Sequence, residues 1–160
     1  MSEPTWHADV VTPALLRHAR NTYGVAMRKA LAGAGFEDIP RNGLYVIGGL
    51  AHGAADAPLG QLVRELRVSK QNAGQLVDAL VMRGYLDRQV DPLDRRRLNV
   101  TLTERGQAAA EAQAAAGRRI DAELVARLGE ADVETLRRGL AVLIDIGAAS
   151  EAAAGDPEMP

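Results

Sequence analysis

The spacing of apolar residues changes just after Gly84, from a helical period to a strand period. Before that glycine, apolar side chains recur every three or four residues, which is the period of an α-helix buried on one face. Residues 86–90 and 98–102 instead alternate between the two sides, as strands do. A chain of 160 residues has room for one domain with at most a small appendage. The sequence therefore predicts a mainly α fold with a single small β-hairpin.

Two helices are predicted near the N-terminus. Thr12 stands where an N-cap belongs, Pro13 follows at the first helical position, and the helix is predicted to stop near Gly33-Ala34-Gly35. A glycine there favours the left-handed backbone at which many helices end. A second helix is predicted over 40–51, although each of its glycines costs about 1 kcal/mol relative to alanine unless close packing needs it.

A short helix, a turn and a longer helix are predicted next. Pro58 opens the short helix, and Ser69 stands at the N-cap position of the longer one, which is predicted over 70–83 and ends at Gly84. One side of the longer helix is apolar and faces the core. Its polar side carries Lys70, Gln71, Asn72 and Gln75.

The loop of the predicted hairpin, residues 91–97, ends in three consecutive arginines. The whole chain has a net charge of −2, but residues 64–105 hold nine basic and six acidic side chains. Alone, an arginine triplet is more often a solvated loop than a binding site. After a capped, amide-rich helix it completes a winged helix-turn-helix, in which the helix reads the major groove of DNA and the hairpin tip enters the minor groove.

Thr103 is expected to cap a long alanine-rich helix that Gly129 ends, and the final helix carries an apolar seam spaced as in a coiled coil. A lobe this small cannot cover the seam, which favours a homodimer, although burial within the monomer stays open. We therefore expect one domain with two parts, a helical dimerisation base over 12–54 and 103–149 and a winged helix-turn-helix lobe over 55–102. A disordered tail is expected over 150–160.

Several classes of protein are excluded. The chain has no cysteine, which removes disulfides, thiolate metal sites and thiol chemistry. Neither His18 nor His52 has a carboxylate at ligand spacing, so no metal site is expected. No phosphate loop or nucleophile elbow is present, which argues against an enzyme, and no cofactor is predicted. Without a membrane-length apolar run or a signal-peptide layout, we expect a cytoplasmic protein that does not enter membranes.

Five short motifs in a fixed order resemble the MarR family, the multiple-antibiotic-resistance type of transcription regulator. They are LRVSKQ at 66–71, LVDAL at 76–80, RGYLDR at 83–88, DPLDRRR at 91–97 and VTLTERG at 100–106. The resemblance implies a homodimer whose first and last two helices interleave, with two lobes on a pseudo-palindromic duplex. Two residues depart from the family pattern: Gly74 lacks a side chain to read a base, and Arg67 replaces a common turn residue.

The resemblance also implies which residues meet DNA. Arg96 matches the wing arginine that enters the minor groove, and Asp94 matches the aspartate that holds it. The full set of candidate DNA-binding residues is Ser69, Lys70, Gln71, Asn72, Gln75, Arg88, Asp94, Arg95, Arg96 and Arg97. The implied function is sequence-specific regulation, as a repressor. The alternative is a winged-helix module that binds proteins and not specific DNA.

The family further implies a cavity between the dimerisation base and the lobes, in which an effector binds. Its candidate residues are Arg17, His18, Tyr23 and Tyr45, and the candidate effector is a small aromatic or phenolic anion. The alternative, which the sequence favours equally, is that these four are ordinary residues of amphipathic helices and bind no effector.

Overall fold

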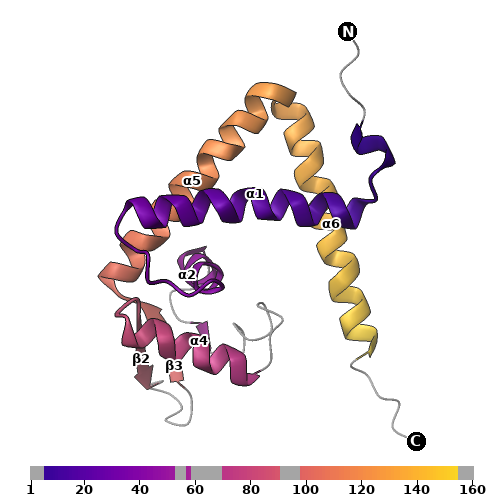
Figure 1. Ribbon diagram of the computed structural model, residues 1–160. Coiled ribbons are helices and arrows are strands. Elements are labelled where there is room, and N and C mark those ends of the chain that lie inside the picture. The colour runs from indigo at the N-terminus through magenta and orange to yellow at the C-terminus, as the bar shows by residue number, and fades with distance from the viewer. Residues whose placement is uncertain (1–5, 53–56, 59–69, 91–97, 155–160) are drawn as a thin grey trace, which may run out of the picture. The chain divides into compact units, whose positions relative to one another are not determined.

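Figure 1 shows a computed structural model of the chain, which describes residues 6–52, 57–58, 70–90 and 98–154. The elements are η1 (Trp6–Asp9), α1 (Thr12–Gly33), α2 (Gly43–His52), β1 (Ala57–Pro58), α4 (Lys70–Met82), β2 (Leu86–Val90), β3 (Leu98–Leu102), α5 (Glu104–Leu128) and α6 (Glu130–Ala154). Two compact units, residues 1–118 and 119–160, make up the chain. Within the described part, no helix is both long and apolar enough to cross a membrane.

Helix α1 has the predicted extent, but its cap differs from the prediction. Val11 is the N-cap residue and makes no side-chain cap bond, so Thr12 is already inside the helix. Pro13 supplies the helical start, because its fixed φ suits the first turn and its missing N–H would have no helical partner. At the other end Gly35 has a φ of +83°, the left-handed conformation expected there.

Helix α2 has glycines because other groups approach it closely. A Cβ at Gly48 would stand 2.8 Å from Nε2 of Gln113, which reaches across from α5 and donates a hydrogen bond to the Leu44 carbonyl at 3.0 Å. Gln113 is buried, and its Oε1 has no hydrogen-bond partner among the described residues. The close packing thus compensates for the low helix propensity of glycine in α2.

The hairpin of β2 and β3 forms with the predicted strand limits, and a third strand was not predicted. Leu86 pairs with Leu102 and Val90 with Leu98, while β1 adds to the other edge of β3 through Ala57 opposite Val100. Pro58 therefore lies in β1, and the prediction that it opens a helix is wrong at that residue. A two-residue strand has no period to detect, and proline at a sheet edge costs no ladder bond. The rest of the short predicted helix lies outside the described residues.

The core of the first unit is aliphatic and lies where α2, α4, β2, β3 and the first half of α5 meet. Figure 1 shows α2 end-on, with α1 on one side of it and α4 and the hairpin on the other. Tyr85, at the start of the hairpin, is fully buried, with its ring edge-on to that of Phe36. The buried cluster comprises Leu31, Leu44, Val46, Ile47, Leu50, Val77, Leu80, Tyr85, Leu86, Val100, Ala109 and Ala110.

The second unit contains the end of α5 and all of α6. Gly129 separates the two helices with a φ of +85°, as its position predicts. Helix α6 continues to Ala154, so residues 150–154 of the predicted disordered tail are helical. Alanine has the highest helix propensity, and Ser150 bonds its hydroxyl to the Ile146 carbonyl at 3.0 Å, within the helix. Residues 155–160 lie outside the described part of the chain.

Candidate nucleic-acid interface

Helix α4 has one side buried and one exposed. Ala73, Val77 and Leu80 are fully buried in the core of the first unit. Gln71, Asn72 and Gln75 lie on the opposite, exposed side, as their positions in the helical period predict. Amide side chains present both a donor and an acceptor, which is the chemistry that base edges in a major groove require. Helix α4 can therefore present a reading surface without losing its packing.

Gly84 ends α4 in the left-handed conformation, with a φ of +74°. Its N–H bonds the Val81 carbonyl and the Tyr85 N–H bonds the Leu80 carbonyl, both at 2.9 Å, which satisfies the last carbonyls of the helix. The backbone then enters β2 directly. This compact turn fixes the direction of the hairpin relative to the exposed side of α4.

Thr103 joins both ends of the hairpin to α5. Its hydroxyl donates to the Gly84 carbonyl at 2.6 Å and accepts from the Gly106 N–H at 3.0 Å. The second bond is the N-cap that the sequence predicts for α5. Gly106 permits this arrangement, because a Cβ there would stand 2.1 Å from the Tyr85 carbonyl oxygen.

Arg88 lies on β2 and forms an ion pair with Asp78 of α4. The pair joins the hairpin to the exposed side of α4, and both side chains keep access to solvent. Arg88 was predicted to meet DNA. It stays a candidate, but its guanidinium is already shared with a carboxylate, which weakens any contact with phosphate.

Asp38, Tyr85 and Arg105 form a polar cluster that was not predicted. The Tyr85 hydroxyl donates to Oδ1 of Asp38 at 2.5 Å, and Nη2 of Arg105 donates to both partners at 3.0 Å. The Tyr85 hydrogen bond, with the charge of Arg105, holds the pKa of Asp38 below its ordinary value. Burial, with the bond to Asp38, raises the pKa of Tyr85. No local pattern could reveal the cluster, since its members are far apart in the sequence.

A pocket of about 410 Å³ lies between α1 and the start of α2, and we call it the arginine pocket. Of the four predicted effector residues, Arg17 and Tyr45 line it, whereas His18 and Tyr23 do not. Helical geometry explains the difference, because residues 18 and 23 fall on other sides of α1 than residue 17. The remaining lining residues are Arg20, Asn21, Gly24, Arg28, Arg41 and Asn42.

Known proteins share both the motif segment and the fold. Residues 37–97 match the model of the MarR family. FabT of Streptococcus pneumoniae, in a crystal structure with DNA, is 21% identical, with 86% of this chain and 95% of that chain covered and a TM-score of 0.72. The chain has the fold of the MarR family. No curated protein matches it.

Two further MarR-type structures agree with this fold. MepR of Staphylococcus aureus in its DNA-binding conformation is 22% identical, covers 85% of this chain and 98% of its own, and has a TM-score of 0.71. The apo form of MarR from Escherichia coli is 24% identical, with coverages of 84% and 97% and a TM-score of 0.64. Members of this family are transcription regulators and not enzymes. The resemblance, the fold class and the non-enzyme prediction are thereby confirmed.

Several residues of the predicted MarR-type site lie outside the described part of the chain. They are Ser69, Asp94, Arg95, Arg96 and Arg97. Lys70 is the first residue of α4, but its side chain is not described. Gly74, the departure from the family pattern, has nothing within 4 Å of a Cβ placed on it. The middle of the α4 reading surface is consequently open.

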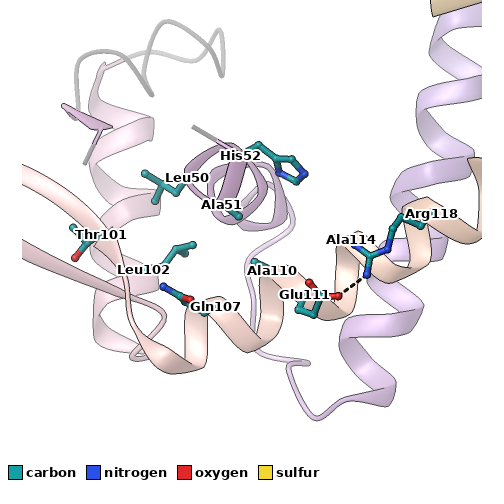
Figure 2. A pocket seen from close by; sticks show the side chains of 10 residues that line it. All are labelled: Leu50, Ala51, His52, Thr101, Leu102, Gln107, Ala110, Glu111, Ala114 and Arg118. Carbon is teal, nitrogen blue, oxygen red and sulfur yellow. Dashed lines mark hydrogen bonds and ion pairs between the residues drawn. The ribbon is translucent and has the colours of Figure 1, made fainter. Parts of the chain in front are cut away.

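A second pocket, of about 450 Å³, lies between the end of α2, β3 and the first half of α5 (Figure 2). His52 closes it on the α2 side and bonds Nδ1 to the Gly48 carbonyl at 2.8 Å. Across the pocket, Glu111 and Arg118 of α5 form an ion pair at 2.5 Å (Figure 2). The charges in this pocket are therefore already balanced. No group of three metal-ligating side chains gathers anywhere in the described residues of this MarR-type chain.

Proposed function

We propose that the chain is a cytoplasmic transcription regulator that binds a pseudo-palindromic operator as a homodimer and represses transcription. The observation that carries the proposal is α4, with its apolar side fully buried and its amide side exposed beside a hairpin. The MarR-type fold adds support, since FabT in the comparison is a complex with DNA. No catalytic or cofactor chemistry is part of the proposal.

In this proposal Gln71, Asn72 and Gln75 read base edges in the major groove, while Ser69 and Lys70 hold phosphates at the start of α4. Arg96 enters the minor groove, with Asp94 holding it and with Arg95 and Arg97 on the backbone. Two lobes then contact half-sites about one helical turn apart, or roughly 10 base pairs centre to centre.

The homodimer is supported by α6. Its apolar side chains Leu136, Leu143 and Ile144 are 44%, 45% and 72% exposed in the single chain. Exposed apolar rows on a long helix favour association, because burying them removes apolar area from water. A second copy of the chain presents the same apolar row on its own α6. The contact in a twofold dimer is self-complementary, so the two rows can cover one another.

Release of DNA by a small effector is the finer part of the proposal. The predicted ligand is an aromatic or phenolic anion, for which the arginine pocket offers Arg17 and Tyr45. An effector releases DNA only if it binds the DNA-incompetent arrangement better. A tenfold loss of DNA affinity needs about 1.4 kcal/mol of differential binding. Titration of salicylate into the protein–DNA complex tests this ligand, with Arg17→Ala as the pocket variant and His18→Ala, outside the pocket, as the control.

Operator binding is tested by selecting duplexes from a random pool and measuring gel shifts over a range of salt. Affinity should fall steeply with salt, because phosphate contacts release counterions. Arg96→Ala should cost about 1–3 kcal/mol on the selected site and flatten any A·T preference beneath the hairpin. Lys70→Ala should weaken all sequences alike.

Arg138→Ala on α6 is the matched control, because it removes one exposed arginine charge outside the lobe, on the side of α6 away from Leu136 and Leu143. Its profile should match that of the wild type. If Arg96→Ala also matches it, the minor-groove role is wrong. Absence of duplex binding even at low salt would favour the alternative, a winged-helix module that binds another protein.

A further inference from the structure

The arginine pocket holds positive charge that no described residue balances. Arg17, Arg20 and Arg28 come from α1, and Arg41 comes from the turn before α2. Among the described residues none of the four guanidiniums forms an ion pair, and the lining contains no carboxylate. Like charges gathered in one recess repel one another, so an anion in the recess is strongly favoured.

The positions of these residues follow from the sequence of α1. Residues 17, 20, 24 and 28 are three or four apart, which places them along one side of the helix. Gly24 leaves room between the arginines: a Cβ there would stand 3.4 Å from both Nη1 of Arg28 and the Tyr45 hydroxyl. The Arg20 guanidinium lies over the Tyr45 ring, 4.6 Å from its centre, which holds it at the wall of the pocket.

We propose that the arginine pocket binds a small phosphorylated molecule through its phosphate groups. A guanidinium is a planar fork that pairs well with phosphate oxygens, and a phosphate monoester or diphosphate offers enough oxygens and charge for several forks at once. One carboxylate has only two oxygens and one charge, which leaves most of the four guanidiniums unpaired. The volume of about 410 Å³ is within the range of small-molecule sites and leaves space for an organic group beside Tyr45.

The backbone of the operator is a poorer occupant of this pocket. The pocket lies between α1 and α2. Helix α4 packs its buried residues toward α2, so the amide side of α4 faces away from α2. In Figure 1, α1 and α4 lie on opposite sides of α2. A duplex on the amide side of α4 is therefore separated from the four arginines by two layers of helix.

This inference deepens the effector proposal, and it rests on that proposal only for the coupling to DNA. It replaces a singly charged aromatic ligand with a multiply charged one in the same pocket. Binding to the pocket is measured without DNA, so a failure of operator binding and a failure of the pocket give separate results.

The test is isothermal titration of the full chain with pyrophosphate, inorganic phosphate and salicylate at constant ionic strength. Pyrophosphate should bind most tightly and salicylate least. Arg17→Gln on α1 and Arg41→Gln in the turn before α2 should each weaken pyrophosphate binding by about tenfold or more, which is the size of one lost charge-assisted hydrogen bond. Arg137→Gln, which removes the same charge outside the pocket, should leave the affinity unchanged.

Gly24→Leu tests the cavity without changing any charge. Leucine suits a helix interior better than glycine, so the fold should persist, as circular dichroism would verify. Its side chain should occupy the space beside Arg28 and Tyr45 and weaken pyrophosphate binding.

Four results would each overturn the proposal. They are no pyrophosphate binding to the wild type, equal weakening by Arg137→Gln, tighter binding of salicylate than of pyrophosphate, and unchanged binding in Gly24→Leu. If Arg17→Gln and Arg41→Gln weakened operator binding in the absence of phosphate as much as Arg96→Ala does, the arginines of the pocket would be assigned to DNA binding instead.

Discussion

Helices α4 and α6 both carry apolar side chains at helical spacing, yet they bury them to different extents. In α4, Ala73, Val77 and Leu80 have no exposed surface, and in α6 the row that includes Leu143 and Ile144 stays open to solvent. The lobe closes its own core because α2 and β2 pack against α4. Among the described residues, helix α6 shares its unit only with the end of α5. The same periodicity therefore specifies a monomer core in one region and an exposed apolar row in the other, which we propose as the association surface.

The contrast drawn between α4 and α6 would be wrong if the protein stayed folded and soluble without its second unit. Removing residues 129–160 should cause aggregation or unfolding, because the proposed association surface is lost and α5 keeps apolar residues that need cover. Sedimentation velocity and circular dichroism would measure this. A truncated chain that remains a folded, soluble monomer would show that the lobe and α5 need no partner.

Among the described glycines, Gly106 leaves the least room for a side chain. Gly106→Ala should lower the free energy of unfolding by about 3 kcal/mol, since its Cβ would overlap the Tyr85 carbonyl oxygen and force α5 away from the hairpin. Urea denaturation measures the loss. An unchanged midpoint would mean that the junction between the hairpin and α5 is looser than the structure has it.

Two helical glycines with open space around them, one on α4 and one on α6, allow a matched test of the comparison. Gly74 on α4 and Gly139 on α6 both have nothing within 4 Å of an added Cβ. Gly74→Ala should stabilise the fold by about 0.5–1 kcal/mol through helix propensity. Gly139→Ala should do the same only if the homodimer leaves that position open. A concentration-dependent loss of stability in Gly139→Ala would place the residue in the dimer contact, and thermal melts at several concentrations would detect it.

The smallest effect concerns pH. Asp38 has a lowered pKa in the folded state, so its contribution is present above its unfolded pKa, near pH 4, and is lost as the pH falls through the folded value. Asp38→Asn should therefore be less stable than the wild type at pH 7, by a small amount because the carboxylate is half-exposed. The difference between the two proteins should shrink below pH 4. A difference that stays constant down to pH 2 would exclude the titration of Asp38 as its cause.

The sequence was sufficient to predict the helices and strands whose apolar residues recur at a regular spacing or whose ends carry a capping residue or a glycine. The limits of α1, the α4 stop at Gly84, the two hairpin strands and the Thr103 cap all follow from local residue order. Strand β1 has no detectable period. The cluster of Asp38, Tyr85 and Arg105 and the contribution of Arg41 to the arginine pocket depend on segments that meet only after folding. Non-local contacts between polar side chains leave no signature in a single sequence.

Thr103 has a consequence for how such a lobe changes over generations. By joining the Gly84 carbonyl to the start of α5, it pins the two ends of the hairpin at one point, independently of the residues between them. Doubling the length of a flexible loop costs only about 0.6 kcal/mol of closure entropy. Insertions and deletions between Val90 and Leu98 should therefore leave the rest of the lobe intact. Mutations in that segment should therefore be tolerated by the fold. Under the proposed function, a chain of this type can change its DNA sequence preference beneath the hairpin while the rest of the lobe keeps its structure.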